Sequence, residues 1–76
     1  MKDRIKKILN DEIEIHELSV EGADAKYEIN IISDVFEGKS IINRHKIIYS
    51  LLNDYIKTGE IHALTIKAKT VGESDK

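Results

Sequence analysis

The sequence predicts a single α+β domain in which helices cover one face of a three-stranded sheet. Its 76 residues are enough for one compact domain. Apolar side chains recur at helical spacing in two segments and alternate along three others. The resulting order, helix–strand–strand–helix–strand, suits a sheet with its helices on one side. No internal repeat or boundary divides residues 1–76, so we expect a core over about 2–70 and a flexible polar tail over 71–76.

The first element is predicted to be a short amphipathic helix over residues 3–10. Ile5, Ile8 and Leu9 lie at i, i+3 and i+4, which gives one apolar stripe for packing on a sheet. Asp3 suits the N-cap or the first turn, and Asn10 is the predicted stop.

Two strands joined by a tight turn come next. Residues 15–21 alternate, with Leu18 and Val20 on one face and Glu17 and Ser19 on the other. The small and polar stretch 21–26 predicts a turn. Residues 27–31 alternate again, which makes them the antiparallel hairpin partner of the first strand.

The connection over residues 33–40 ends in Gly38-Lys39-Ser40, like the end of a phosphate-binding P-loop. That loop needs a first glycine five residues before Gly38, and Ser33 occupies this place. The backbone cradle for phosphate is therefore missing, and nucleotide hydrolysis is not predicted.

A second helix is predicted over residues 43–57 and a third strand over 61–69. Asn43 is the expected N-cap, and the preceding Ile41-Ile42 pair is expected to tuck under the helix in a tight turn. Gly59 is the expected left-handed residue after the helix end. The third strand alternates between an apolar face and a polar face.

Composition and charge exclude several classes of function. The chain has no cysteine, which rules out a disulfide framework, a zinc ribbon and a thiol nucleophile. Its 14 acidic and 12 basic residues give a net charge of -2, without the overall basic charge of a nucleic-acid binder. No apolar run approaches the ~20 residues of a membrane span, and the N-terminus does not look like a secretory signal. We therefore expect a cytoplasmic protein without membrane contact.

The residues by themselves predict no enzyme and no small-molecule substrate. The three histidines, His16, His45 and His62, show no short metal-binding spacing. No serine lies in a nucleophile elbow or at motif spacing from a histidine. A hydrogen-bonded structural role is the alternative for each histidine.

Three separated stretches resemble the BolA family. They are Ser33-Asp34-Val35-Phe36-Glu37-Gly38-Lys39-Ser40, Asn43-Arg44-His45-Lys46-Ile47-Ile48-Tyr49 and Ile61-His62-Ala63-Leu64. They occur in family order and spacing, and the resemblance covers most of the chain. It implies an α-β-β-α-β fold similar to a class II KH domain.

The resemblance also implies a non-enzymatic adaptor in iron–sulfur cluster assembly, trafficking or iron homeostasis. Such proteins bind monothiol glutaredoxins with a Cys-Gly-Phe-Ser site and share a 2Fe–2S cluster with them. The glutaredoxin and its glutathione supply the thiolates, so the isolated chain is expected to bind no cluster. His62 matches the family's histidine ligand. Further partner contacts are implied at Phe36, Gly38, Arg44 and Lys46.

One departure from the family concerns the second cluster ligand. Relatives place a histidine or cysteine in the turn between the first two strands, whereas residues 21–26 hold neither, and Lys26 stands where the histidine is often found. His45 is a replacement if the second helix starts beside the start of the third strand. Otherwise the complex forms without a stable bridging cluster. His16 has no family support. The C-terminus also lacks the family's tryptophan, and no C-terminal helix is expected.

A nucleic-acid-binding transcriptional regulator is the alternative function, because the family is linked to transcription and resembles KH domains. The Gly-x-x-Gly loop with which KH domains hold the backbone is absent. A small basic patch for DNA remains available. It comprises Lys39, Arg44, Lys46, Lys67 and Lys69.

Overall fold

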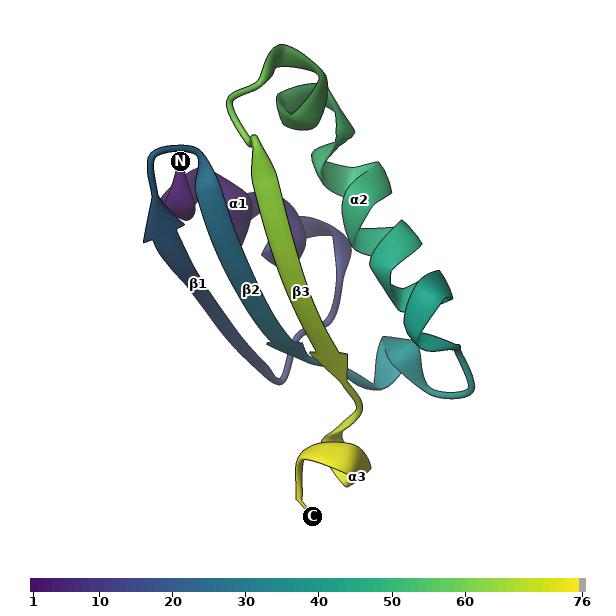
Figure 1. The fold of residues 1–76 in the computed structure, drawn as a ribbon. Helices are drawn as coiled ribbons and strands as arrows, with labels where there is room; N and C mark the ends of the chain where they lie inside the picture. The colour runs from purple at the N-terminus through teal and green to yellow at the C-terminus, as the bar shows by residue number, and fades with distance from the viewer. Residues whose placement is uncertain (76) are drawn as a thin grey trace.

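The computed structural model describes residues 1–75 and follows the predicted order, with two short additional helices (Figure 1). The elements are α1 (Lys2–Glu12), β1 (Glu17–Ala23), β2 (Lys26–Ile32), the 3-10 helix η1 (Asp34–Phe36), α2 (Ile41–Thr58), β3 (Ala63–Lys69) and α3 (Val71–Ser74). The predicted α+β class is confirmed.

Within residues 1–75 the sheet has the order β1-β2-β3 and mixes two kinds of pairing. β1 and β2 form the predicted antiparallel hairpin, with Val20 opposite Ile29, while β2 and β3 run parallel, with Ile29 opposite Ile66. Parallel neighbours need a crossover, and α2 supplies it. The chain leaves the end of β2, returns along α2 and enters β3 (Figure 1). The start of α2 therefore lies near the end of β3.

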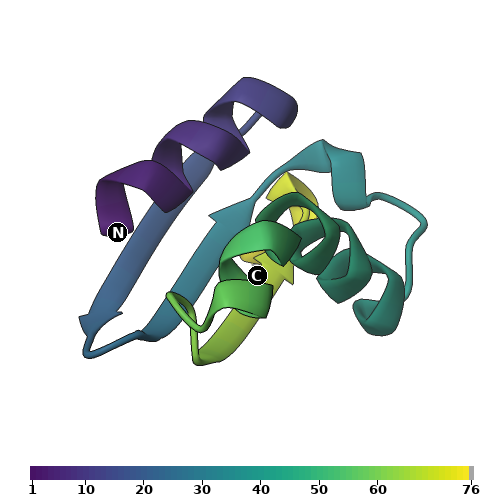
Figure 2. The same cartoon turned by 90° about the horizontal axis from the view of Figure 1, so that it is seen from above.

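The core lies between the helices and one face of the sheet. Seen from above, α1 runs alongside β1 and α2 lies beside β3 (Figure 2). Ile5 and Leu9 of α1 and Ile48 and Leu52 of α2 are all 0% exposed, as the helical spacing predicts. The Arg4 guanidinium also donates to the Tyr55 hydroxyl at 3.2 Å, linking the helices at the surface.

The boundaries at the N-terminal half differ slightly from the prediction. Asn10 does not stop α1, and the helix continues to Glu12. The Asn10 side-chain Nδ2 donates to the Lys6 carbonyl at 2.9 Å. β1 begins at Glu17, two residues later than expected. Asp3 lies in the first helical turn.

The start of α2 was predicted wrongly. Ser40 is the N-cap, because its hydroxyl accepts from the Asn43 amide at 3.2 Å, and Asn43 is already helical. Ile41 and Ile42 form the first turn and are 69% and 67% exposed, so they do not tuck under the helix. The predicted end is confirmed, since Gly59 is left-handed at φ 84°.

The C-terminal segment is helical where a flexible tail was predicted. Residues 71–74 form α3 with a capping box, in which the Thr70 hydroxyl accepts from the Glu73 amide and the Glu73 carboxylate accepts from the Thr70 amide. The expectation of no C-terminal helix is therefore wrong for these residues. Residue 76 lies outside the described residues.

Candidate functional site

His62 is an exposed side chain on a firmly held backbone, immediately before β3. Its amide donates to the Ala25 carbonyl at 2.7 Å, and the Ala63 amide donates to the same oxygen at 3.2 Å. On the other side, Ile61 is 1% exposed and its amide bonds to the Tyr55 carbonyl at 3.0 Å. The backbone is thus fixed while the imidazole faces solvent.

The hairpin turn beside His62 supplies no soft ligand. Asp24 and Ala25 both have positive φ, at 54° and 66°, which forms the tight turn that joins β1 to β2. Lys26 is exposed and pairs with Ala63, the neighbour of His62. The two ligand positions that the family resemblance implies are therefore adjacent here, although only His62 carries a metal-binding side chain.

Metal-binding side chains do not gather into a common site in the described part of the chain. Residues 1–75 contain no group of three or more histidine, cysteine, aspartate or glutamate side chains placed to bind one ion. The exposed His62 imidazole is chemically suited to serve as one ligand of an iron–sulfur cluster whose other ligands come from another molecule.

His45 does not lie beside His62, so the condition for its role as the second ligand is not met. It is half-buried and lines a groove with Ile66 and Ala68, near the end of β3. Ile66 follows His62 by four residues, which is about 13 Å along a strand. About 13 Å of strand therefore separates His62 from the part of β3 that His45 faces, which argues against both imidazoles binding one 2Fe–2S cluster. The crossover that makes β3 parallel to β2 causes this separation.

Arg44 was predicted to contact partners, but the structure uses it inside the domain. It is 8% exposed, and its guanidinium donates to the Lys39 carbonyl at 2.9 Å and to the Ala68 carbonyl at 3.0 Å. Two more bonds, of 2.6 and 3.0 Å, reach the Glu73 carboxylate. The hydrogen bond to Glu73 raises the pKa of Arg44, so the group remains charged. Arg44 joins the start of α2, the end of β3 and α3.

The preceding family motif is largely structural as well. Phe36 is 0% exposed and so is unavailable to a partner, contrary to the prediction. Gly38 adopts φ 74°, which favours glycine. The buried Ser33 donates through its hydroxyl to the Glu14 carbonyl at 2.6 Å, and its amide donates to the Lys69 carbonyl at 2.9 Å. Gly38 and Lys46 remain exposed.

The predicted basic patch is smaller than its residue types suggest. Arg44 is paired with Glu73, and the Lys67 ammonium lies 3.2 Å from the Glu28 carboxylate. Lys39, Lys46 and Lys69 are exposed, and no carboxylate in residues 1–75 lies within ion-pair distance of them. Lys39 and Lys69 line the groove that also contains His45.

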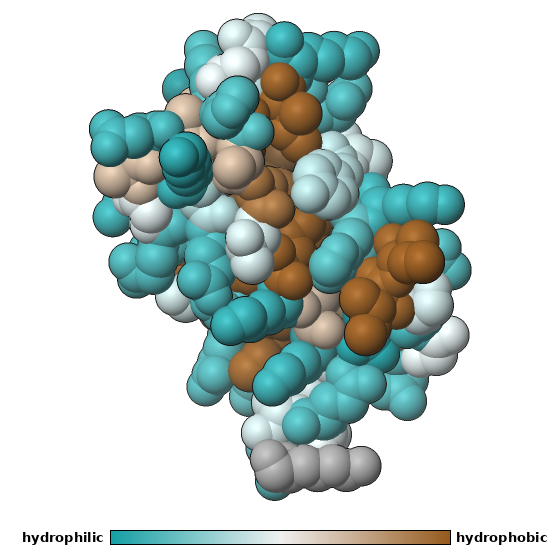
Figure 3. All heavy atoms as spheres, in the orientation of Figure 1, coloured by the Kyte–Doolittle hydropathy of each residue, from teal (hydrophilic) through white to brown (hydrophobic). Residues whose placement is uncertain are grey.

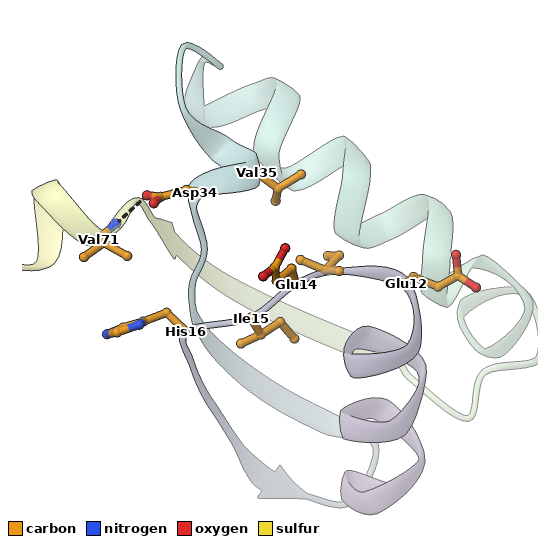
Figure 4. Close-up of a pocket in the computed structure, with 8 residues that line it drawn as sticks. Glu12, Glu14, Ile15, His16, Asp34, Val35 and Val71 are labelled. Carbon is orange, nitrogen blue, oxygen red and sulfur yellow. Dashed lines mark hydrogen bonds between the residues drawn. The ribbon is translucent and has the colours of Figure 1, made fainter.

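Sequence reasoning missed Asp34 and Glu73, which attach α3 to the rest of the domain. The Asp34 carboxylate accepts from the Val71 amide at 3.2 Å, at the edge of an open hollow that His16 also lines (Figure 4). The Thr-x-x-Glu spacing of Thr70 and Glu73 was a capping-box signal for α3. No sequence signal links Glu73 to Arg44, which lies 29 residues earlier.

Among the described residues, no helix has the length and apolar character needed to cross a membrane.

Comparisons with known proteins agree with this fold and these motifs. The family model described as "BolA-like protein" matches residues 6–73. The solved BolA domain of SufE1 from Arabidopsis thaliana superposes with a TM-score of 0.88 and 40% identity, covering 95% of this chain and 93% of that one.

Two curated relatives extend the comparison. SufE-like protein 1 of Arabidopsis thaliana is 48% identical over 50 residues, which are 66% of this chain but only 13% of that protein. The acid stress protein IbaG of Escherichia coli is 28% identical over 71 residues, covering 93% of this chain and 84% of the relative. Because the family model spans most of the chain, the protein belongs to the BolA family.

Proposed function

We propose that this protein is a non-enzymatic adaptor that binds a monothiol glutaredoxin and takes part in 2Fe–2S cluster assembly or trafficking, with His62 as its cluster ligand. The observation that carries the proposal is the exposed His62 imidazole on a backbone fixed to the hairpin turn. The cluster is a cargo shared with the partner.

The ligand chemistry supports a half-site. An imidazole that replaces a thiolate on one iron is an established form of 2Fe–2S ligation. This chain has no cysteine, so the thiolates must come from the glutaredoxin and its glutathione. The His62 backbone amide donates a hydrogen bond to the Ala25 carbonyl, which fixes the position of the His62 Cα. The ring nitrogens are then left to bind the cluster on the partner's side.

His62 acts as the single histidine ligand of this chain. His45 is at the other end of β3, and the hairpin turn has neither histidine nor cysteine. We expect the shared cluster to be held less firmly than one with two ligands from the same adaptor. Lys26 pairs with Ala63, so a histidine in its place would lie next to His62.

The test mixes the purified protein with a cluster-loaded monothiol glutaredoxin and follows the visible circular dichroism spectrum. Wild type should change the spectrum, and His62→Ala should leave that of the glutaredoxin alone. His45→Ala and the exposed His16→Ala are matched controls that should behave as wild type. The proposal fails if wild type has no effect or if His62→Ala retains the full change.

A gain-of-ligand variant provides a second, independent readout. Lys26→His should slow the loss of the visible signal to a chelator, because it adds an imidazole beside His62. The matched variant Lys39→His, near the start of α2, should not slow it. If both variants slow the loss of the visible signal equally, the position for a second ligand is not at the hairpin turn.

A further inference from the structure

A second surface lies at the opposite end of β3 from His62. It is an open groove of about 580 Å³ between the start of α2 and the end of β3, which we call the α2–β3 groove. Its lining includes Lys39, Ile41, His45, Ile66, Ala68 and Lys69. Figure 3 shows hydrophobic residues exposed over the N-terminal half of α2 on this side of the molecule.

The apolar side chain at the rim of the groove, that of Ile41, does not belong to the hydrophobic core of residues 1–75. Ile41, His45 and Tyr49 follow one another at i, i+4 and i+8, so they form one stripe on α2. Ile41 is 69% exposed and Tyr49 is 41% exposed. A large aliphatic side chain at the rim of a groove is a contact that a bound apolar group would bury.

The polar part of the groove is cationic although the whole chain is acidic. Four cationic residues line it, Lys39, Arg44, Lys67 and Lys69, together with one acidic residue, Glu73. The Lys67 ammonium is paired with the Glu28 carboxylate of β2, which is not part of this lining. Arg44 and Glu73 are bonded to each other. Lys39 and Lys69 have no carboxylate of residues 1–75 within ion-pair distance. The groove therefore complements negative charge beside an apolar contact.

We propose that the α2–β3 groove docks an extended acidic segment of a partner protein, with an apolar side chain of that segment packed against Ile41. This interaction does not depend on the cluster function of His62, because the two surfaces lie at opposite ends of β3.

Two other occupants fit the groove less well. A second copy of the chain docked groove to groove would bring Lys39 and Lys69 against the same lysines of the other copy. Strand pairing at the outer edge of β3 is also obstructed, since the Leu64 carbonyl accepts from the Tyr49 hydroxyl and the Ala68 carbonyl accepts from Arg44. A nucleic-acid phosphate would match the lysines but leave Ile41 without a contact.

The test is a chemical-shift titration of the isotope-labelled full chain with the blocked synthetic peptide Asp-Glu-Leu-Asp-Ile-Glu-Asp. Shifts should cluster at groove residues. Ile41→Ser should raise the Kd about tenfold, because a buried isoleucine side chain is lost. Lys69→Gln should raise it about threefold. A peptide with serine in place of leucine and isoleucine should bind about tenfold more weakly.

Matched controls separate the groove from general surface effects. Ile42→Ser changes a side chain of equal exposure that does not line the groove, and Lys6→Gln removes a charge on α1. Both variants should bind the peptide with a Kd within about twofold of the wild-type value. His62→Ala should bind the peptide as wild type does.

Several outcomes would overturn the proposal. It fails if Ile42→Ser weakens binding as much as Ile41→Ser does, or if the chemical shifts change outside the groove. A double-stranded oligonucleotide that shifts the same residues, with no effect of Ile41→Ser, would identify the groove as a phosphate site. A dimer in sedimentation that Ile41→Ser abolishes would identify a second copy as the occupant.

Discussion

Replacing Arg44 by methionine should destabilise the whole domain and release α3, although Arg44 stands in a motif that suggests partner binding. Methionine retains the length of the side chain but removes the guanidinium. The Lys39 and Ala68 carbonyls then lose their donor, and the Glu73 carboxylate loses its ion pair.

The expected loss of stability in Arg44→Met follows from the environment of each group that is bonded to Arg44. A hydrogen bond with a charged donor contributes about 1.5 kcal/mol at the low end of its range. The Glu73 side chain is 45% exposed, so water compensates much of its loss, and this pair adds about 0.5–1 kcal/mol. With two such bonds lost, to the Lys39 and Ala68 carbonyls, we expect Arg44→Met to cost about 3.5–4 kcal/mol in total. For a domain of this size that lowers the Tm by roughly 15–30 °C.

The assay is urea unfolding followed by circular dichroism, with amide exchange to report on α3. Lys46→Met is the matched control, because Lys46 is exposed on the same helix, and it should change the stability by less than about 0.5 kcal/mol. Glu73→Gln should cost only about 0.5–1 kcal/mol. If Arg44→Met costs no more than Lys46→Met, or if exchange in α3 is unchanged, Arg44 does not join these elements.

Four further substitutions test other features by the same unfolding measurement. Ala25→Gly should stabilise the domain by about 0.5–1 kcal/mol, because Ala25 has φ 66°, and a lower midpoint would contradict this. Gly22→Ala should cost more than about 2 kcal/mol, since a Cβ there would lie 2.1 Å from the Lys26 carbonyl oxygen; a small effect would mean that the turn rearranges. Phe36→Ala should cost about 3–5 kcal/mol, and an unchanged midpoint would be inconsistent with its burial. His62→Ala should stay within about 0.5 kcal/mol of wild type, so a large loss would make His62 structural.

Local sequence patterns were sufficient to predict most of the helices and strands, but not the residues at which they begin and end. The stripes of α1 and α2 and the alternation of the strands depend on neighbouring residues, so periodicity identified them. The start of α2 was misplaced because Ser40 and Asn43 are both good N-caps, and the sequence does not say which of them the preceding loop presents. α3 was missed because its four residues carry no periodic signal and their stability comes from distant contacts of Asp34 and Arg44.

Residue types and their spacing were enough to predict the α+β class, the apolar faces that form the core, and His62 as an isolated histidine in a family motif. Which motif residues are accessible depends on the three-dimensional packing. The parallel pairing of β2 and β3 sends α2 back along the sheet, so His45 lies at the end of β3 and His62 at its start. Arg44 is a buried structural residue because Ala68 and Glu73, both far along the chain, accept hydrogen bonds from its guanidinium. Burial and long-range pairing depend on which elements meet in space, and residue type and spacing do not encode that.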